Sequence, residues 1–386
     1  MSTVIRPMRS GEELQVARLL DEAFGAVPFE TRRRLWDWRT RENPARDLLG
    51  LPSFLVAEAA GEIVGVHGLF PLRLQVGSQI VPVSCACDFA VSPSARTAGL
   101  KLKLEAARCG QVQAHLSTSA NEAASRLTVA LGGVEVPEAN TTYVKPLRFA
   151  AVASRHASRL GRGLPGGRTL GLVGSVAGGI MDSAGGTLRR LRGIPNPLRG
   201  CVVSRVRSFG PEHQELTNEA TANTNAHILR DTRYLNWRYL GYPFSGIEAL
   251  EVRAGGELAA VGVSHSHLDS AGNQVGSILE LLYRPDASEI ALGLLSLMED
   301  HLRERGAVVC LLRAGSVNLR EALKVRGFRA REGRRSPYTY RVGHQAPKAL
   351  SDGPPRWYLS LGDGDAAFHW PKGEREKTKP QNIDRS

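Results

Sequence analysis

CACDFAVSPSARTAGLKLKL, residues 85–104, is the stretch on which the fold prediction rests. Its first part, Cys85–Val91, is mostly apolar and partly alternating, which predicts a half-buried strand. Pro93 ends this strand because proline has no donor for the ladder. The segment Arg96–Lys101 then leads into a predicted helix and carries Gly99 in the loop. Free backbone N–H groups at the positive end of a helix dipole bind phosphate, so this corner predicts a pyrophosphate cradle.

The same residues resemble motif A of the GCN5-related N-acetyltransferases, the GNAT family, whose loop pattern Arg/Gln-x-x-Gly-x-Gly/Ala binds the diphosphate of acetyl-coenzyme A. Arg96-x-x-Gly99 matches this pattern, whereas Lys101 replaces the second small residue. Its side chain either crowds the diphosphate or pairs with a phosphate. Leucines 100, 102 and 104 also alternate with charged residues as in a strand, so a strand is the other interpretation here. The resemblance implies cofactor contacts from Arg96, Thr97, Ala98, Gly99, Leu100 and Lys101.

The composition is that of a soluble globular protein. With 386 residues, 42% hydrophobic and 23% charged, the chain is long enough for two domains. The formal net charge of +12 favours an anionic partner, and a nucleotide-bearing cofactor is one such partner. Aromatic residues, at 6%, are too scattered for base-stacking platforms, so we expect no specific nucleic acid.

Five irregularly spaced cysteines predict neither a disulfide framework nor a zinc site, and we expect no metal. Cys85 and Cys87, two apart on one strand face, are interpreted as small core residues rather than a redox or metal pair. The first 25 residues include four acids and no apolar core, and no apolar run reaches about 18 residues. We therefore expect a cytoplasmic protein.

Several sequence features occur twice in the same order, which predicts a tandem duplication. Trp38-Arg39 recurs as Trp237-Arg238, each at the same distance before a proline. Asp88 precedes Pro93 by five residues, and Glu280 precedes Pro285 by five. The Trp-Arg pairs are interpreted as packing residues, with an acceptor-binding surface between the copies as the alternative.

The fold class predicted is α/β, of the mixed α+β type. It has two tandem GNAT-like domains, each a mixed, mostly antiparallel sheet with a splayed parallel strand pair flanked by helices. Three antiparallel runs, 54–58, 63–67 and 72–83, lead into the first parallel strand. The predicted layout is a cofactor-binding domain at 1–148, a basic linker at 149–200, a second domain at 201–365 and a charged tail at 366–386.

The second copy lacks the cradle. Asp286 and Glu289 stand where a diphosphate would lie, and their charges would repel it. We therefore expect cofactor binding in the first copy alone. The linker has Asp182 as its only acid and is a candidate for peripheral contact with anionic surfaces.

The resemblance implies that an amine attacks the thioester of acetyl-coenzyme A, or another acyl-coenzyme A, directly. A backbone donor for the thioester carbonyl is expected from Phe89, Ala90 and Val91. The pantetheine amides need open strand edges, which arise if this strand and Val112–Ser117 splay apart.

The catalytic candidates are few. Asp88 is the first candidate base, with a strand-end salt bridge as its structural alternative, and His67 is the second, with core packing as its alternative. No tyrosine lies within 121–131, so Tyr143 is the nearest candidate acid. Asn121 either contacts the cofactor or caps a helix.

The function predicted is therefore acyl transfer to a small-molecule or sugar-linked amine. A non-catalytic acyl-coenzyme A-binding tandem module is the first alternative. The second is a Fem-like transferase that uses aminoacyl-tRNA, since such enzymes are also doubled.

Overall fold

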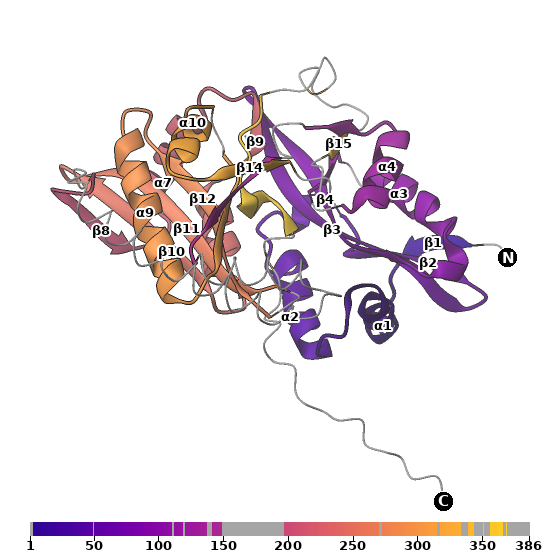
Figure 1. Ribbon diagram of the computed structural model, residues 1–386. Coiled ribbons are helices and arrows are strands. Elements are labelled where there is room, and N and C mark those ends of the chain that lie inside the picture. The colour runs from indigo at the N-terminus through magenta and orange to yellow at the C-terminus, as the bar shows by residue number, and fades with distance from the viewer. Residues whose placement is uncertain are drawn as a thin grey trace, which may run out of the picture.

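The computed structural model describes residues 3–48, 50–109, 112–118, 120–136, 141–148, 197–269, 272–314, 317–332, 339–342, 350, 356–365 and 368. Most of the predicted linker and tail lies outside these residues. The described chain forms two mixed sheets that lie side by side (Figure 1). No helix in these ranges combines the length and the apolar character needed to cross a membrane.

The first sheet has strand order β1-β2-β3-β4-β5-β15-β6, and β9 also pairs with β3. Its strands are β1 (Val4–Pro7), β2 (Phe54–Ala59), β3 (Glu62–Val76), β4 (Gln79–Val91), β5 (Ala114–Ser117), β6 (Val134–Glu135), β9 (Ala226–Ile228) and β15 (Thr339–Val342). The pair β4/β5 is parallel, and the other pairs are antiparallel.

Two of the predicted runs were divided wrongly. The runs 63–67 and 72–76 form one long strand, β3, and 79–83 continues into β4. The hairpin between them turns at Gly77, whose φ of 55° is favourable for glycine. The sequence predicted a break in the strand at residues 68–71. The strand continues there, and Gly68 pairs with Cys87 and Pro71 with Ser84 of β4.

The second sheet has strand order β14-β7-β13-β12-β11-β10-β8. Its strands are β7 (Thr141–Pro146), β8 (Cys201–Arg205), β10 (Ile247–Ala254), β11 (Glu257–Leu268), β12 (Gln274–Tyr283), β13 (Val309–Leu312) and β14 (Arg329–Glu332). Here β12/β13 is the parallel pair. The predicted fold class, with a parallel pair in each mixed sheet, is confirmed.

The two sheets exchange a strand. β7, from the first half of the chain, inserts between β13 and β14. β15, from the second half, inserts between β5 and β6. Strand pairing therefore departs from the predicted limits 1–148 and 201–365, since neither sheet is complete without the other half.

Helices cover both faces of each sheet. In the first half these are α1 (Glu13–Phe24), α2 (Phe29–Thr40), α3 (Ala98–Arg108) and α4 (Glu122–Ala130). The apolar face of α1 packs on one side of the sheet with Val56 and Val66, and α3 packs on the other with Leu55 and Leu69. The second half has α7 (Pro211–Thr221), α8 (Thr232–Leu235), η4 (Asn236–Leu240), α9 (Ser288–Glu304) and α10 (Val317–Val325).

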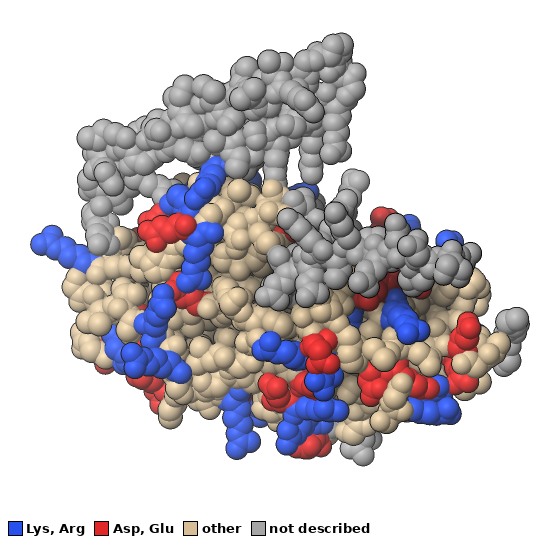
Figure 2. Space-filling model, turned by 90° about the horizontal axis from the view of Figure 1, so that it is seen from below, with Lys and Arg blue, Asp and Glu red and all other residues tan. Residues whose placement is uncertain are grey.

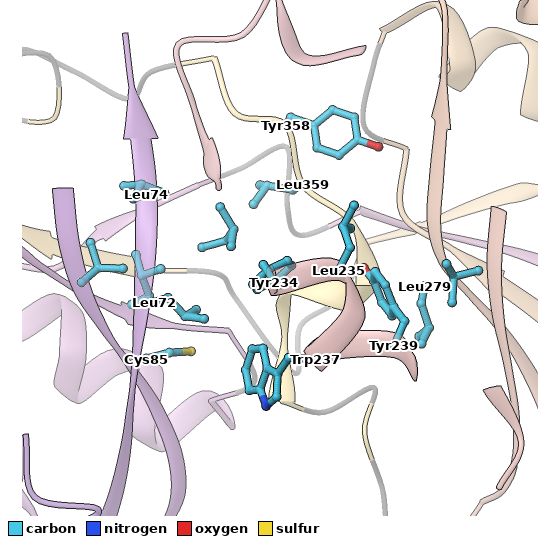
Figure 3. Packing of buried hydrophobic residues seen from close by; sticks show 14 of the residues in the cluster. Leu72, Leu74, Cys85, Tyr234, Leu235, Trp237, Tyr239, Leu279, Tyr358 and Leu359 are labelled. Carbon is cyan, nitrogen blue, oxygen red and sulfur yellow. The ribbon is translucent and has the colours of Figure 1, made fainter. Parts of the chain in front are cut away.

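The largest apolar cluster lies between the two sheets and joins them. Figure 3 shows side chains of the first sheet facing Leu279 of the second, with residues of α8 and η4 between them. At its centre Trp38 of α2 stacks on Trp237 of η4, with ring centroids 5.1 Å apart. Each indole N–H donates to the backbone carbonyl of the other tryptophan, at 3.0 and 2.7 Å. This reciprocal contact is what a two-fold relation between copies produces.

We expect Trp38→Ala to lower the free energy of unfolding by about 3–5 kcal/mol, because it empties a fully buried site and removes a hydrogen bond. Since the cluster belongs to both sheets, circular dichroism in denaturant is expected to show one cooperative transition. The control is Val325→Ala, at a side chain that is 90% exposed. Two separate transitions, with only one shifted, would contradict a shared core.

Candidate functional site

The first sheet opens between its two parallel strands. β4 pairs with β5 at Val83, Ser84 and Cys85 only. Beyond Cys85 the described residues include no further pairing between these strands, although β4 continues to Val91 along β3. Within the described residues, the β5 side of 86–91 therefore has no strand partner. This opening between β4 and β5 leaves backbone groups with which a ligand can pair.

The open segment of β4 contains a β-bulge. Asp88 has φ of 45°, and the register with β3 shifts between Val66 and Gly68. A bulge bends the strand and re-aims its side chains. As a result Asp88 points toward α2 and Phe89 toward α3, on opposite faces of the sheet. Phe89, Ala90 and Val91 form the last residues of this open edge.

The corner after β4 is a 3₁₀ turn, η2 (Pro93–Ala95), followed by α3. Thr97 is the N-cap of α3, and no side chain caps this end. Arg96, Thr97, Leu100 and Lys101 are exposed, whereas Ala98 and Gly99 are buried. The helix expected over 101–109 is confirmed and begins earlier, at Ala98, and Lys101 points to the outside. A Cβ built at Gly99 would lie 3.4 Å from Phe89 and Val91, an ordinary contact, so packing does not require glycine here.

Asp88 is held in place by two side chains of α2. Its Oδ2 accepts hydrogen bonds from Arg39 Nη1 at 3.1 Å and from Trp36 Nε1 at 3.2 Å. The Arg39 guanidinium is 4% exposed. Burial opposes its charge, but Asp88 and other nearby negative groups outweigh burial and raise the pKa of Arg39. The salt bridge considered as the structural alternative for Asp88 is therefore present.

His67 lies on the other face of the sheet. It is fully buried, and its ring contacts Phe89 with centroids 5.1 Å apart. Nδ1 lies 3.1 Å from the carbonyl of Gly68, so this nitrogen carries the proton. Nε2 has no hydrogen-bond partner. Burial, and next the charge of Lys103, lower the pKa of His67 well below its usual value, so the ring is neutral.

Two further candidates lie elsewhere. Tyr143 is in β7, 4% exposed within the core of the second sheet, and pairs with Leu312 and Ala330. The structure therefore does not bring it to the opening. Asn121 is the N-cap of α4, and its Oδ1 accepts from the backbone N–H of Ala124 at 2.9 Å. Its capping role, one of the two interpretations, is thus present.

Sequence reasoning missed a carboxylate from the far end of the chain. Thr118 follows β5, and its hydroxyl donates to Oδ1 of Asp365 at 3.2 Å. Asp365 also contributes to the raised pKa of Arg39, so it lies on the Asp88 side of the opening. The available signal was the Gly-Asp-Gly-Asp sequence ending at Asp365, whose partner could not be read locally.

A buried lysine on the α3 side was also missed. Lys103 is 5% exposed, and its Nζ donates to Oγ1 of Thr128 on α4 at 2.9 Å. Its sequence neighbours Leu102 and Leu104 concealed it, because alternation with leucine suggested an outward-facing lysine. Lys103 therefore joins α3 to α4 beside the opening.

The second sheet opens at the equivalent place. β12 and β13 pair from Val275 to Ile278 only. A cavity of about 640 Å³ lies there, lined by Leu281 of β12, Glu289 of α9 and Leu319 of α10 among others. Glu280, the counterpart of Asp88, is fully buried and bonded to Arg230 at 2.7 Å. Glu289 therefore stands near the start of α9, and Arg320 and Arg356 also line the cavity.

The cysteines of β4 are ordinary core residues. Cys85 and Cys87 are buried and not bonded to one another. Burial raises the pKa of the Cys85 thiol to about 12, so it stays protonated. Within the described part of the chain no group of histidine, cysteine and acid side chains is arranged to hold a metal.

Comparison with known proteins identifies the first half. Residues 4–120 match the family model described as "Acetyltransferase (GNAT) domain". Over these residues the chain is similar to the GNAT family. The matched region contains the open edge of β4 and the corner before α3. The search among curated proteins returned no match to the chain.

Solved structures with the same fold include an N-acetyltransferase and an N-myristoyltransferase. A GCN5-related N-acetyltransferase from Anabaena variabilis aligns with TM-score 0.53 and 11% identity, over 88% of this chain and 73% of that chain. Yeast N-myristoyltransferase with bound myristoyl-CoA aligns with TM-score 0.54 and 13% identity, over 90% and 80%. At such identities the likeness shows the fold alone. The match nevertheless extends over both halves.

The buried histidine of the GNAT domain leads to a prediction on pH. The folded-state pKa of His67 is lowered, and that of His227 is lowered to about 3 by burial. As the pH falls, the two histidines therefore bind protons at a higher pH in the unfolded chain than in the folded chain. The free energy of unfolding is expected to fall as the pH drops below about 6.5, by up to about 1.4 kcal/mol per pH unit for each histidine. Denaturation of His67→Gln between pH 7 and pH 4 should show a shallower slope. A profile parallel to that of the wild type would contradict a neutral His67.

Proposed function

We propose that this protein is an N-acyltransferase that moves an acetyl or longer acyl group from acyl-coenzyme A to an amine by direct attack. The observation that carries the proposal is the opening in the first sheet. β4 leaves β5 after Cys85, and its free edge runs to the uncapped start of α3. Coenzyme A has a pantetheine arm with amide groups, followed by a diphosphate. The open backbone groups of the strand can pair with the amides, and the helix N-terminus can bind the diphosphate.

The residues around the opening fit the parts of the cofactor. Arg96 and Thr97 are exposed at the helix start, where a diphosphate would meet backbone N–H groups. Lys101 is exposed on the next turn and is free to pair with a phosphate rather than to crowd it. Phe89–Val91 follow the bulge at Asp88 along this edge, where a backbone N–H donor would stabilise charge on the thioester oxygen.

The proton of the attacking amine needs an acceptor, and the two candidates lie on opposite faces. Asp88 lies on the α2 side with Arg39. His67 lies on the α3 side, where α3 would cover the cofactor. An acceptor amine reaches the thioester from the face that the cofactor leaves open. We therefore assign the base to Asp88, directly or through a water, with His67 second.

A non-catalytic acyl-coenzyme A-binding module is the second candidate. It is favoured by one observation, that Tyr143 lies in the other sheet and not at the opening. Nothing comparable favours an aminoacyl-tRNA substrate. On the face seen in Figure 2, Lys and Arg are interspersed with Asp and Glu and form no continuous basic track. The acceptor proposed is a small-molecule or sugar-linked amine.

Thr97→Glu is expected to abolish the rise in melting temperature that acetyl-coenzyme A causes in the wild type. The new carboxylate would lie at the diphosphate site and repel it, while remaining favourable for the helix itself. Thr97→Gln is the matched control, since it has nearly the same shape without the charge. Calorimetry should show a loss of affinity on the order of tenfold or more for Thr97→Glu only. Equal affinity for both variants would place the cofactor elsewhere.

We expect one acyl-coenzyme A per chain, because Glu289 lies at the start of α9 where the second cradle would be. Isothermal calorimetry measures this number directly. Release of thiol in the presence of a panel of amines then separates an enzyme from a binding module. Two equal sites per chain would show that the second copy has kept its cofactor site.

A further inference from the structure

Lys103 is a buried ammonium without a counter-ion. Its side chain is 5% exposed, and no carboxylate in the described part of the chain forms an ion pair with it. Its recorded contacts are the hydroxyl of Thr128 at 2.9 Å and the ring of Phe89, whose centroid is 4.9 Å from Nζ. The Thr128 hydroxyl donates to the carbonyl of Ala124, so its oxygen is fixed as an acceptor for Lys103.

The groups that face Lys103 are neutral or basic. His67 of β3 and His115 of β5 lie nearby, and Lys103 and His115 both contribute to lowering the pKa of His67. His115 is itself bonded to Ser84 of β4 at 2.7 Å. The acid nearest in sequence on β4, Asp88, is turned to the opposite face by the bulge. The surroundings therefore leave the positive charge of Lys103 uncompensated.

An uncompensated buried charge is unfavourable, so a stability role explains Lys103 poorly. Lysine is depleted from interiors unless paired, and a methionine or leucine would fill the same space at lower cost. Charged groups retained in such a position are candidates for a functional site. What the site lacks is an anion.

Lys103 lies close to the edge of β4 at which the cofactor is proposed to bind, so the cofactor is the expected source of an anion. Its ammonium lies over Phe89, a residue of the open β4 edge. It bridges α3 and α4, on the same side of the sheet as the cofactor-binding corner. Under the proposed function, on which this step depends, the thioester lies at this edge, and its cleavage produces a thiolate.

We propose that Lys103 stabilises the departing coenzyme A thiolate and then protonates it. The acceptor nitrogen forms a bond to the carbonyl carbon, the carbon–sulfur bond breaks, and its electron pair goes to sulfur. A proton then passes from Nζ to sulfur, giving the free thiol and a neutral amine. The proton that the acceptor amine lost to its base returns through solvent to Lys103, so charge and protons balance.

The acidity of Lys103 suits this role. Burial lowers its pKa to about 8, near the ordinary value of about 8.5 for a cysteine thiol. Proton transfer between groups of matched pKa has almost no thermodynamic barrier. Thr128 would act as a positioning residue that keeps the ammonium over Phe89.

The test uses the thiol of bound coenzyme A and needs no acceptor. The ultraviolet absorbance of the thiolate is titrated in the complex, and the same complex with desulfo-coenzyme A is subtracted. A neighbouring ammonium should lower the thiol pKa by on the order of one unit in the wild type. In Lys103→Met this shift should be lost, whereas Lys103→Arg should keep it.

Turnover and stability complete the test. Lys103→Arg keeps the charge but has no proton to give near neutral pH, so its thiol release should be slower than that of the wild type although the thiol pKa is still lowered. Lys103→Met should be at least as stable as the wild type to denaturant, which a merely structural lysine would not allow.

The outcomes separate the two proposals. If coenzyme A does not bind the wild type, the proposed function fails. If it binds and its thiol pKa is the same in the wild type and Lys103→Met, the role of Lys103 is wrong while the proposed function stands. A large loss of stability in Lys103→Met together with an unshifted thiol would assign Lys103 to packing.

Discussion

The reciprocal contact between Trp38 and Trp237 is the interaction on which the rest of the structure depends. Each indole stacks on the other and donates to the other's backbone. Because both are buried, a shift of either half would leave two N–H groups and two carbonyls unpaired in an apolar core. This contact thus fixes the relative position of α2 and η4. Arg39, next to Trp38, is thereby held against Asp88 at the opening.

The two faces of the opening have different chemistry as a result. The α2 side carries Asp88, with Asp365 nearby on Thr118. The α3 side carries Lys103 and His67. A bulge at one residue, Asp88, separates them, because it reverses which face that side chain and Phe89 occupy. The acidic group of β4 and the basic groups of β3 and α3 therefore lie on opposite faces of the sheet.

Local patterns in the sequence predicted what is determined locally. The partly alternating apolar residues of 85–91 and Pro93 predicted a strand that is part of β4. The Arg96–Gly99 loop predicted the helix α3 that follows. The Trp-Arg repeats correctly indicated packing residues. The strand exchange could not be predicted. The sequence of 141–146 can indicate that a strand forms, but it does not indicate that this strand, β7, pairs within the second sheet. The same holds for Asp365, which lies 247 residues beyond Thr118 in the chain. The sequence also did not determine the direction of the Lys103 side chain, because leucines 102 and 104 fit either a strand or a helix.

The exchange of β7 and β15 makes each half of the chain necessary to the sheet of the other half. Here each sheet contains a strand encoded in the other half, so removing the second copy would leave β5 and β6 without the strand between them. The second half is therefore needed to complete the backbone of the first sheet, whatever its own interior binds.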